Sequence, residues 1–157
     1  MRRADREITN TSEIREILAA CDVCRIGFGG EIPYIVPMNF GWEERDSRLT
    51  LYFHCAHEGR KLERMREGGV VCFEMDTRHR LETAQLPCQY TMYYDSIMGI
   101  GRLSEVDDPA EKVRGLKSIL HQLEPGRPHE IDVRQAATVT VLRLDVQSLS
   151  AKGHRAH

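Results

Sequence analysis

The chain has 157 residues, 41% hydrophobic and 29% charged, a composition typical of one globular domain, which we expect to span residues 1–157. Its 22 basic and 24 acidic residues leave a net charge of −2, which argues against nucleic acid or an anionic membrane surface as a partner. The sequence also lacks a bilayer-spanning apolar run and an apolar signal segment, so we expect a cytoplasmic protein with no membrane partner.

The cysteines agree with a reducing compartment. There are five, an odd number, and most of them lie in apolar, strand-like segments, where buried free thiols are common. Cys21 and Cys24 have the spacing of half a zinc or redox site, but no second Cys-x-x-Cys accompanies them. His54 and Cys55 are neighbours on a predicted strand and therefore point to opposite faces. We expect no metal site.

The first predicted element is an amphipathic helix. Asn10 and Glu13 have the spacing of a capping box, and apolar residues follow at positions 14, 17, 18 and 21. Residues 23–28 then form a short apolar strand, and Gly29-Gly30 provides a hairpin turn.

The partner strand of this hairpin, over residues 32–42, contains Pro33 and Pro37. Each proline removes a backbone donor from the strand. Two interpretations remain open: a sheet edge protected against aggregation, or a strand whose free backbone groups face a planar ligand. Residues 43–48 are predicted to form a charged turn.

The central strand, over residues 49–54, alternates apolar and polar side chains and ends in small and polar residues. A helix over residues 59–66 follows, with Arg60 and Lys61 at its start and Gly68-Gly69 after its end. Helix starts favour anions because their first N–H groups lack partners. The two cations indicate either a phosphate seat or an ordinary solvated basic face.

The second half of the chain is predicted to be mostly strand. Residues 70–75 form a strand, residues 76–88 a loop, and residues 89–103 a long strand. In the long strand, Gly99 and Gly101 suggest a bend or the close approach of another group.

A helix starts at Asp108, with proline and glutamate at the first and third helical positions. A last strand covers residues 138–146, and we expect residues 151–157 to be a loose tail. Six strands and three helices, mostly joined as meanders, favour a small antiparallel barrel with peripheral helices over a doubly wound sheet.

Three segments resemble those of one known family: residues 33–41 (PYIVPMNFG), 51–61 (LYFHCAHEGRK) and 90–101 (YTMYYDSIMGIG). In this order they are similar to the pyridoxamine 5'-phosphate oxidase-like split barrels, and within these most similar to the nitroimidazole-resistance (Nim) group. The resemblance implies a mainly β (α+β) fold, a six-stranded antiparallel split β-barrel with peripheral helices. It also implies a homodimer with FMN in a groove at the dimer interface.

The resemblance assigns cofactor-binding residues. The elbow and helix start would hold the phosphate through His54, Cys55, Ala56, Gly59, Arg60 and Lys61, and Phe53 at the strand end would also bind the cofactor. The flavin ring would lie along Val36, Pro37, Met38 and Asn39, and the partner subunit would close the groove through Ser96.

The implied function is that of a flavin-dependent, nitroreductase-like oxidoreductase that reduces a small nitroaromatic or quinone-like acceptor. His54 is the candidate catalytic residue, as a proton donor, although a simple contact to phosphate stays open. The alternative function is a non-catalytic flavin or haem carrier, store or sensor. The C-terminal tail lacks clear counterparts of the basic and aromatic residues that grip pyridoxamine phosphate, so synthesis of pyridoxal phosphate is not expected.

Overall fold

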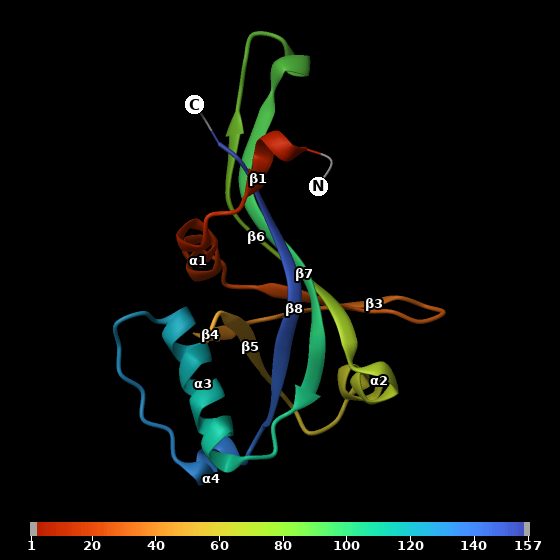
Figure 1. Cartoon of the computed structure of the whole chain (residues 1–157), viewed down its shortest axis with the longest axis vertical. Coiled ribbons are helices and arrows are strands. Elements are labelled where there is room, and N and C mark those ends of the chain that lie inside the picture. Colours follow the sequence, from red (N-terminus) through yellow and green to blue (C-terminus); the bar gives the residue numbers. More distant parts are fainter. Residues whose placement is uncertain (1–2, 156–157) are drawn as a thin grey trace.

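A computed structural model describes residues 3–155 (Figure 1). Its strands form one antiparallel sheet in the order β3-β2-β6-β7-β8-β5-β4, with the two-residue β1 on the far end of β8. The strands are β1 (Glu7–Ile8), β2 (Cys24–Phe28), β3 (Tyr34–Met38), β4 (Gly41–Arg45), β5 (Arg48–Cys55), β6 (Val70–Glu82), β7 (Thr91–Glu105) and β8 (Thr140–His154). The predicted mainly β, antiparallel architecture is confirmed.

The single strand predicted over residues 32–42 is wrong, because the chain forms two strands there. β3 ends at Met38, and the Asn39 side chain donates a hydrogen bond to the Asp22 carbonyl at 2.9 Å. Phe40 is fully buried, so the chain passes through the core before β4 begins. Asp46 and Ser47, both with positive φ, make the two-residue turn from β4 to β5, a shorter turn than predicted.

The loop predicted over residues 76–88 is also wrong in its first half. β6 continues to Glu82, and its pairing with β7 extends to Glu82 and Thr91. Figure 1 shows this hairpin projecting well beyond the rest of the sheet. A bulge at Arg78, whose φ is 58°, shifts the register between Thr77 and Arg80 and obscures the alternation in the sequence.

The last strand runs further than expected. β8 continues to His154, so the predicted loose tail is wrong for this part, and residues 156–157 lie outside the described residues. Ala151 is buried, and Arg155 donates to Asp95 at 2.8 Å and to Glu13 at 3.0 Å. These contacts fix the end of the chain against β7 and α1.

Four α-helices lie around the sheet: α1 (Thr11–Ala20), α2 (Arg60–Gly68), α3 (Pro109–Leu123) and α4 (Val133–Ala136). Two short 3-10 turns, η1 (Ala4–Arg6) and η2 (Pro87–Gln89), complete the secondary structure of residues 3–155. As predicted, Asn10 caps α1 and Asp108 caps α3, and the left-handed Gly69 ends α2. α4 was not predicted, although Asp132 and Gln135 form a capping box at its start.

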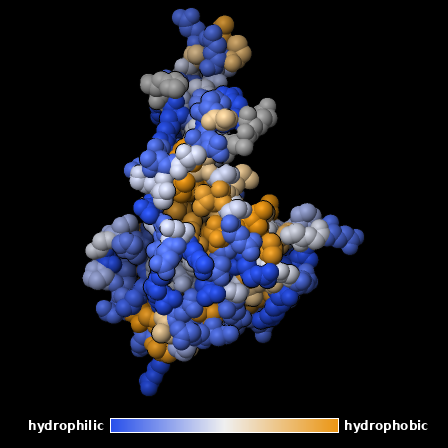
Figure 2. Space-filling view, in the orientation of Figure 1, coloured by the Kyte–Doolittle hydropathy of each residue, from blue (hydrophilic) through white to orange (hydrophobic). Residues whose placement is uncertain are grey.

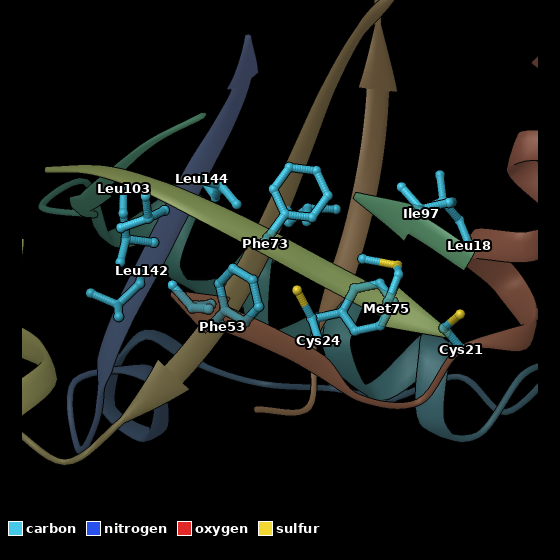
Figure 3. Close-up of a cluster of buried hydrophobic side chains, with 14 of the residues drawn as sticks. Leu18, Cys21, Cys24, Phe53, Phe73, Met75, Ile97, Leu103, Leu142 and Leu144 are labelled. Carbon is cyan, nitrogen blue, oxygen red and sulfur yellow. The ribbon is translucent and has the colours of Figure 1, made fainter. Parts of the chain in front are cut away.

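The barrel interior is the main hydrophobic core, and α1 contributes to one side of it (Figure 3). The labelled core side chains are Leu18, Cys21, Cys24, Phe53, Phe73, Met75, Ile97, Leu103, Leu142 and Leu144. A second, smaller cluster on the other face of β5 contains Tyr52 and Val141 together with Ile119 of α3. β5 therefore has an inner face toward the barrel core and an outer face that α3 partly covers.

Candidate functional site

β3 presents its side chains alternately to the barrel core and to the outside. Tyr34, Val36 and Met38 pack against the main core, whereas Ile35 and Pro37 are exposed. A ligand on the outer face can therefore touch the side chain of Pro37 but only the backbone of Val36 and Met38. Asn39 is exposed, but its amide nitrogen already donates to the Asp22 carbonyl.

The side chains at the end of β5 also alternate between the barrel core and the outside. Phe53 is fully buried and Cys55 nearly so, both in the main core. His54 is exposed and shares the outer face of β5 with Tyr52, because alternate residues point the same way. His54 and Pro37 thus both lie on the outside of the barrel, whereas Phe53 and Cys55 could contact an outer ligand only through their backbones.

The elbow after β5 leaves the start of α2 open. Gly59 precedes the helix with φ 133°, a conformation that side-chain-bearing residues rarely adopt, and a Cβ there would meet nothing within 4 Å. Among the described residues no side chain caps this start, in contrast to α1, α3 and α4. Ala56 and Arg60 are exposed at the elbow and Lys61 is half-buried. The arrangement offers backbone donors and two cations to an anion.

The start of α2 also contacts β3. The Arg60 guanidinium lies 4.4 Å from the centroid of the Tyr34 ring, a cation–π contact. Tyr34 in turn stacks on Phe28 of β2, with ring centroids 5.7 Å apart. The strand and the helix start that the resemblance assigns to the flavin ring and its phosphate are therefore in contact.

Ser96 is the one predicted binding residue that lies apart from the others within this chain. It sits in the middle of β7, where β8 separates it from β5, and β2 and β6 separate it from β3. Ser96 is only 7% exposed. A role at the elbow therefore requires a second copy of the chain, as the resemblance implies.

The sequence reasoning missed a hollow of about 680 Å³ on the outer face of the sheet. Exposed Ile35, Met98 and Ile100 line it, and Figure 2 shows apolar surface gathered over the middle of β7 and β8. Gly27 lies on this outer face, where a Cβ would clash with the exposed Cys72, whereas a Cβ at Gly99 would meet the core ring of Phe73. The residues that line the hollow come from five strands, β2, β3, β6, β7 and β8, so no local pattern in the sequence marks it.

Cys21 and Cys24 are buried free thiols. Burial raises the pKa of Cys21 to about 12, and burial also raises the pKa of Cys24 well above its usual range. Such thiols carry little thiolate at neutral pH and are poor nucleophiles or metal ligands. Within residues 3–155 no three histidine, cysteine or acidic side chains are grouped to hold a metal ion.

We predict that a thiol reagent at pH 8 labels Cys88 in the folded protein, because Cys88 is exposed in the connection between β6 and β7, outside the apolar hollow. Cys21, Cys24 and Cys55 should react only in denaturant, since they are buried. Mass spectrometry of labelled peptides checks this, and rapid native labelling of Cys21 would contradict the structural role assigned to it.

Comparison with known proteins identifies the family. A family model described as pyridoxamine 5'-phosphate oxidase matches residues 10–153. The chain belongs to this family. The family and the split-barrel fold predicted from the sequence are thereby confirmed. No helix in the described part of the chain is long and apolar enough to cross a membrane.

Solved structures agree with the family assignment. A proposed 5-nitroimidazole antibiotic resistance protein from Bacteroides thetaiotaomicron is 29% identical over 94% of this chain and 86% of its own, with a TM-score of 0.78. The flavocytochrome Anf3 from Azotobacter vinelandii is 22% identical over 99% of this chain and 72% of its own, with a TM-score of 0.79. An FAD and haem binding protein from Mycobacterium smegmatis is 16% identical over 96% of this chain and 74% of its own, with a TM-score of 0.79. Among curated protein sequences, none matches this chain significantly.

Proposed function

We propose that the chain binds FMN on the outside of the barrel, between β3 and the start of α2. We further propose that it is a flavin-dependent oxidoreductase of a small nitroaromatic or quinone-like acceptor. The observation that carries the proposal is the contact between Arg60, at the uncapped start of α2, and Tyr34 of β3. This contact places a helix start suited to bind a phosphate next to a strand suited to bind a flavin ring.

The residues present fit both ends of the cofactor. Arg60, Lys61 and the free N–H groups of the helix start suit a phosphate dianion. β3 ends the sheet order and pairs only with β2 among the described strands, so one edge of its backbone is unpaired. An unpaired strand edge provides donors and acceptors for the polar edge of a flavin ring.

The names of relatives support a flavin as the cofactor and a nitroaromatic as the acceptor. One relative is described as a flavocytochrome, one as an FAD and haem binding protein, and one, from Mesorhizobium loti, as an FAD-binding protein. The relative that is 29% identical is described as a proposed nitroimidazole resistance protein. A small aromatic nitro group accepts electrons readily, which favours this class of acceptor.

Bound FMN would supply the two-electron chemistry, with a reduced nicotinamide as donor, and the protein provides binding and proton transfer. Two-electron reduction of a quinone by a reduced nicotinamide delivers one hydride and consumes one proton. His54 lies on the outer face, beyond the buried Phe53, where its imidazole can hold that proton. Arg60 and Lys61 bind and orient the phosphate.

We also propose that the active form is a homodimer whose second copy covers the outer face of the sheet. Ile35 is 67% exposed, Met98 55% and Ile100 47%, and all three line the apolar hollow. Clustered apolar exposure of this kind marks an interaction surface. A two-fold dimer would bury the same face of both copies and bring Ser96 of one copy toward the other.

The proposed dimer predicts that flavin binding and assembly are linked. Free FMN at about 100 times its Kd should tighten the dimer at least about a hundredfold, as measured by sedimentation of dilute apoprotein. Met98→Asp should weaken both dimerisation and FMN binding, because it places a charge in the apolar hollow. Leu123→Asp, at an exposed position on α3, is the control. Full FMN affinity in a monomer contradicts the shared site.

The absorption spectrum of the purified protein tests the proposed function most directly. A flavin spectrum that bleaches anaerobically with a reduced nicotinamide, and recovers on addition of a nitroaromatic or a quinone, supports the oxidoreductase. A flavin spectrum that no nicotinamide bleaches supports the non-catalytic alternative. A Soret band identifies haem and overturns FMN as the cofactor.

A further inference from the structure

Two arginines one helical turn apart fasten α2 to the β2–β3 hairpin. Arg60 stacks on the Tyr34 ring, and Arg64 donates to the Gly29 carbonyl at 2.5 Å and to the Ile32 carbonyl at 3.2 Å. Residues at positions i and i+4 share a helix face, so both side chains reach toward the same hairpin. The helix and the hairpin are thereby joined at two points.

The backbone of the hairpin turn leaves space for the Arg64 side chain. Gly30 has φ 128°, and a Cβ at this position would collide with the Arg64 guanidinium. The side chain of Arg64 is only 20% exposed, and Glu67 accepts from its Nη1 at 2.8 Å. Nη2 donates to both carbonyls while Nη1 donates to Glu67, and the single nitrogen of a lysine ammonium reproduces this three-way arrangement poorly.

The Tyr34 contact has a different consequence for Arg60. A cation–π contact needs no hydrogen bond, so it leaves the N–H groups of the Arg60 guanidinium available to an anion. Tyr34 itself packs on Phe28 and against the main core, so its ring is a fixed platform. An arginine held in this way loses less conformational freedom when it binds an anion.

The geometry points to Tyr34 and Arg64 as positioning residues. They fix the position of the proposed phosphate site, at the start of α2, relative to β3, the strand along which the flavin ring would lie. This inference rests on the proposed function, because it assumes the phosphate at Arg60 and the ring along β3. Neither Tyr34 nor Arg64 needs to touch the flavin. Tyr34 holds the guanidinium of Arg60 in place. Arg64 fixes the distance between α2 and β3.

The test compares FMN with riboflavin, which has the same ring but no phosphate. Fluorescence titrations of apoprotein give the two Kd values, and the ratio of the two affinities reports the contribution of the phosphate seat. Tyr34→Leu should lower that ratio about two- to fivefold, the range of a cation–π contact, while riboflavin affinity stays unchanged. Tyr34→Phe keeps an aromatic platform and should keep the ratio of the unmodified protein.

Arg64→Lys provides an independent variant that keeps the charge of α2. It should lower the ratio to a similar extent, whereas Arg66→Lys, at an exposed position of the same helix, should leave it unchanged. A double-mutant cycle then tests the route of action. Tyr34→Leu in an Arg60→Ala background should cause no further loss if Tyr34 acts through Arg60.

Several outcomes overturn the inference. An unchanged ratio in both Tyr34→Leu and Arg64→Lys removes the positioning role while leaving the proposed flavin site intact. Equal losses of FMN and riboflavin affinity, or additive losses in the cycle, assign these residues to general stability of the fold. If the unmodified protein binds neither flavin, the proposed function fails first and this inference fails with it.

Discussion

Replacing both Arg60 and Lys61 with alanine is expected to lower FMN affinity by about a hundredfold or more. Charge-assisted hydrogen bonds contribute roughly 1.5–3 kcal/mol each, and the double variant removes both side-chain cations from the start of α2. The fold should survive, because Arg60 is exposed and Lys61 half-buried at a helix end. Titration of apoprotein with FMN, followed by flavin fluorescence, measures the loss, and circular dichroism checks the fold.

A charge-matched control separates this seat from general electrostatic attraction. Arg45 and Arg48 flank the turn between β4 and β5, and both are exposed. The double variant Arg45→Ala/Arg48→Ala changes the net charge by the same amount and should bind FMN as the unmodified protein does. Riboflavin affinity should be unchanged in both double variants. Undiminished FMN affinity without Arg60 and Lys61 would refute the phosphate seat.

The features predicted correctly from the sequence depend on local chemistry. The side chains of Asn10 and Asp108 cap their helices by accepting from backbone N–H groups two or three residues further along the chain. Gly69 ends α2 in a left-handed conformation. Such signals need no knowledge of the rest of the fold. The start of α2, with Arg60 and Lys61, was predictable for the same reason.

The features that were missed depend on distant pairing. The outer half of β6, residues 77–82, is mostly polar and interrupted by the bulge at Arg78, so its strand character comes from pairing with β7. β8 extends to His154 because β7 and β1 pair with it there. Propensity is a weak guide where neighbouring strands decide the conformation.

The structure shows which of the predicted site residues face outward, a point that the sequence settles only in part. Alternation in the sequence already opposes Phe53 to His54, and the structure confirms that the first is buried and the second exposed. The sequence could not show that Val36 and Met38 turn inward, because the two prolines obscure the alternation of β3. The apolar hollow could not be predicted either, since residues from five strands, β2, β3, β6, β7 and β8, line it together.

The substitution His54→Gln is expected to retain FMN but to lower turnover about a hundredfold or more, the lower range for loss of a general acid. His54 is exposed on the outer face of the barrel, two residues before Ala56, where the elbow begins. Glutamine keeps a hydrogen-bonding side chain but cannot act as a general acid, whereas an imidazolium can. Any pH dependence of turnover that arises from this imidazole should therefore disappear.

His57→Gln is the matched control for this experiment. His57 is also exposed, but its Nδ1 lies 3.0 Å from Thr140 Oγ1, so the structure gives it a partner within the chain. We expect His57→Gln to keep both turnover and the pH profile. If His54→Gln loses FMN instead, His54 is a phosphate-binding residue. If it keeps the turnover and pH profile of the unmodified protein, His54 is neither acid nor base, and the proton must come from solvent or another group.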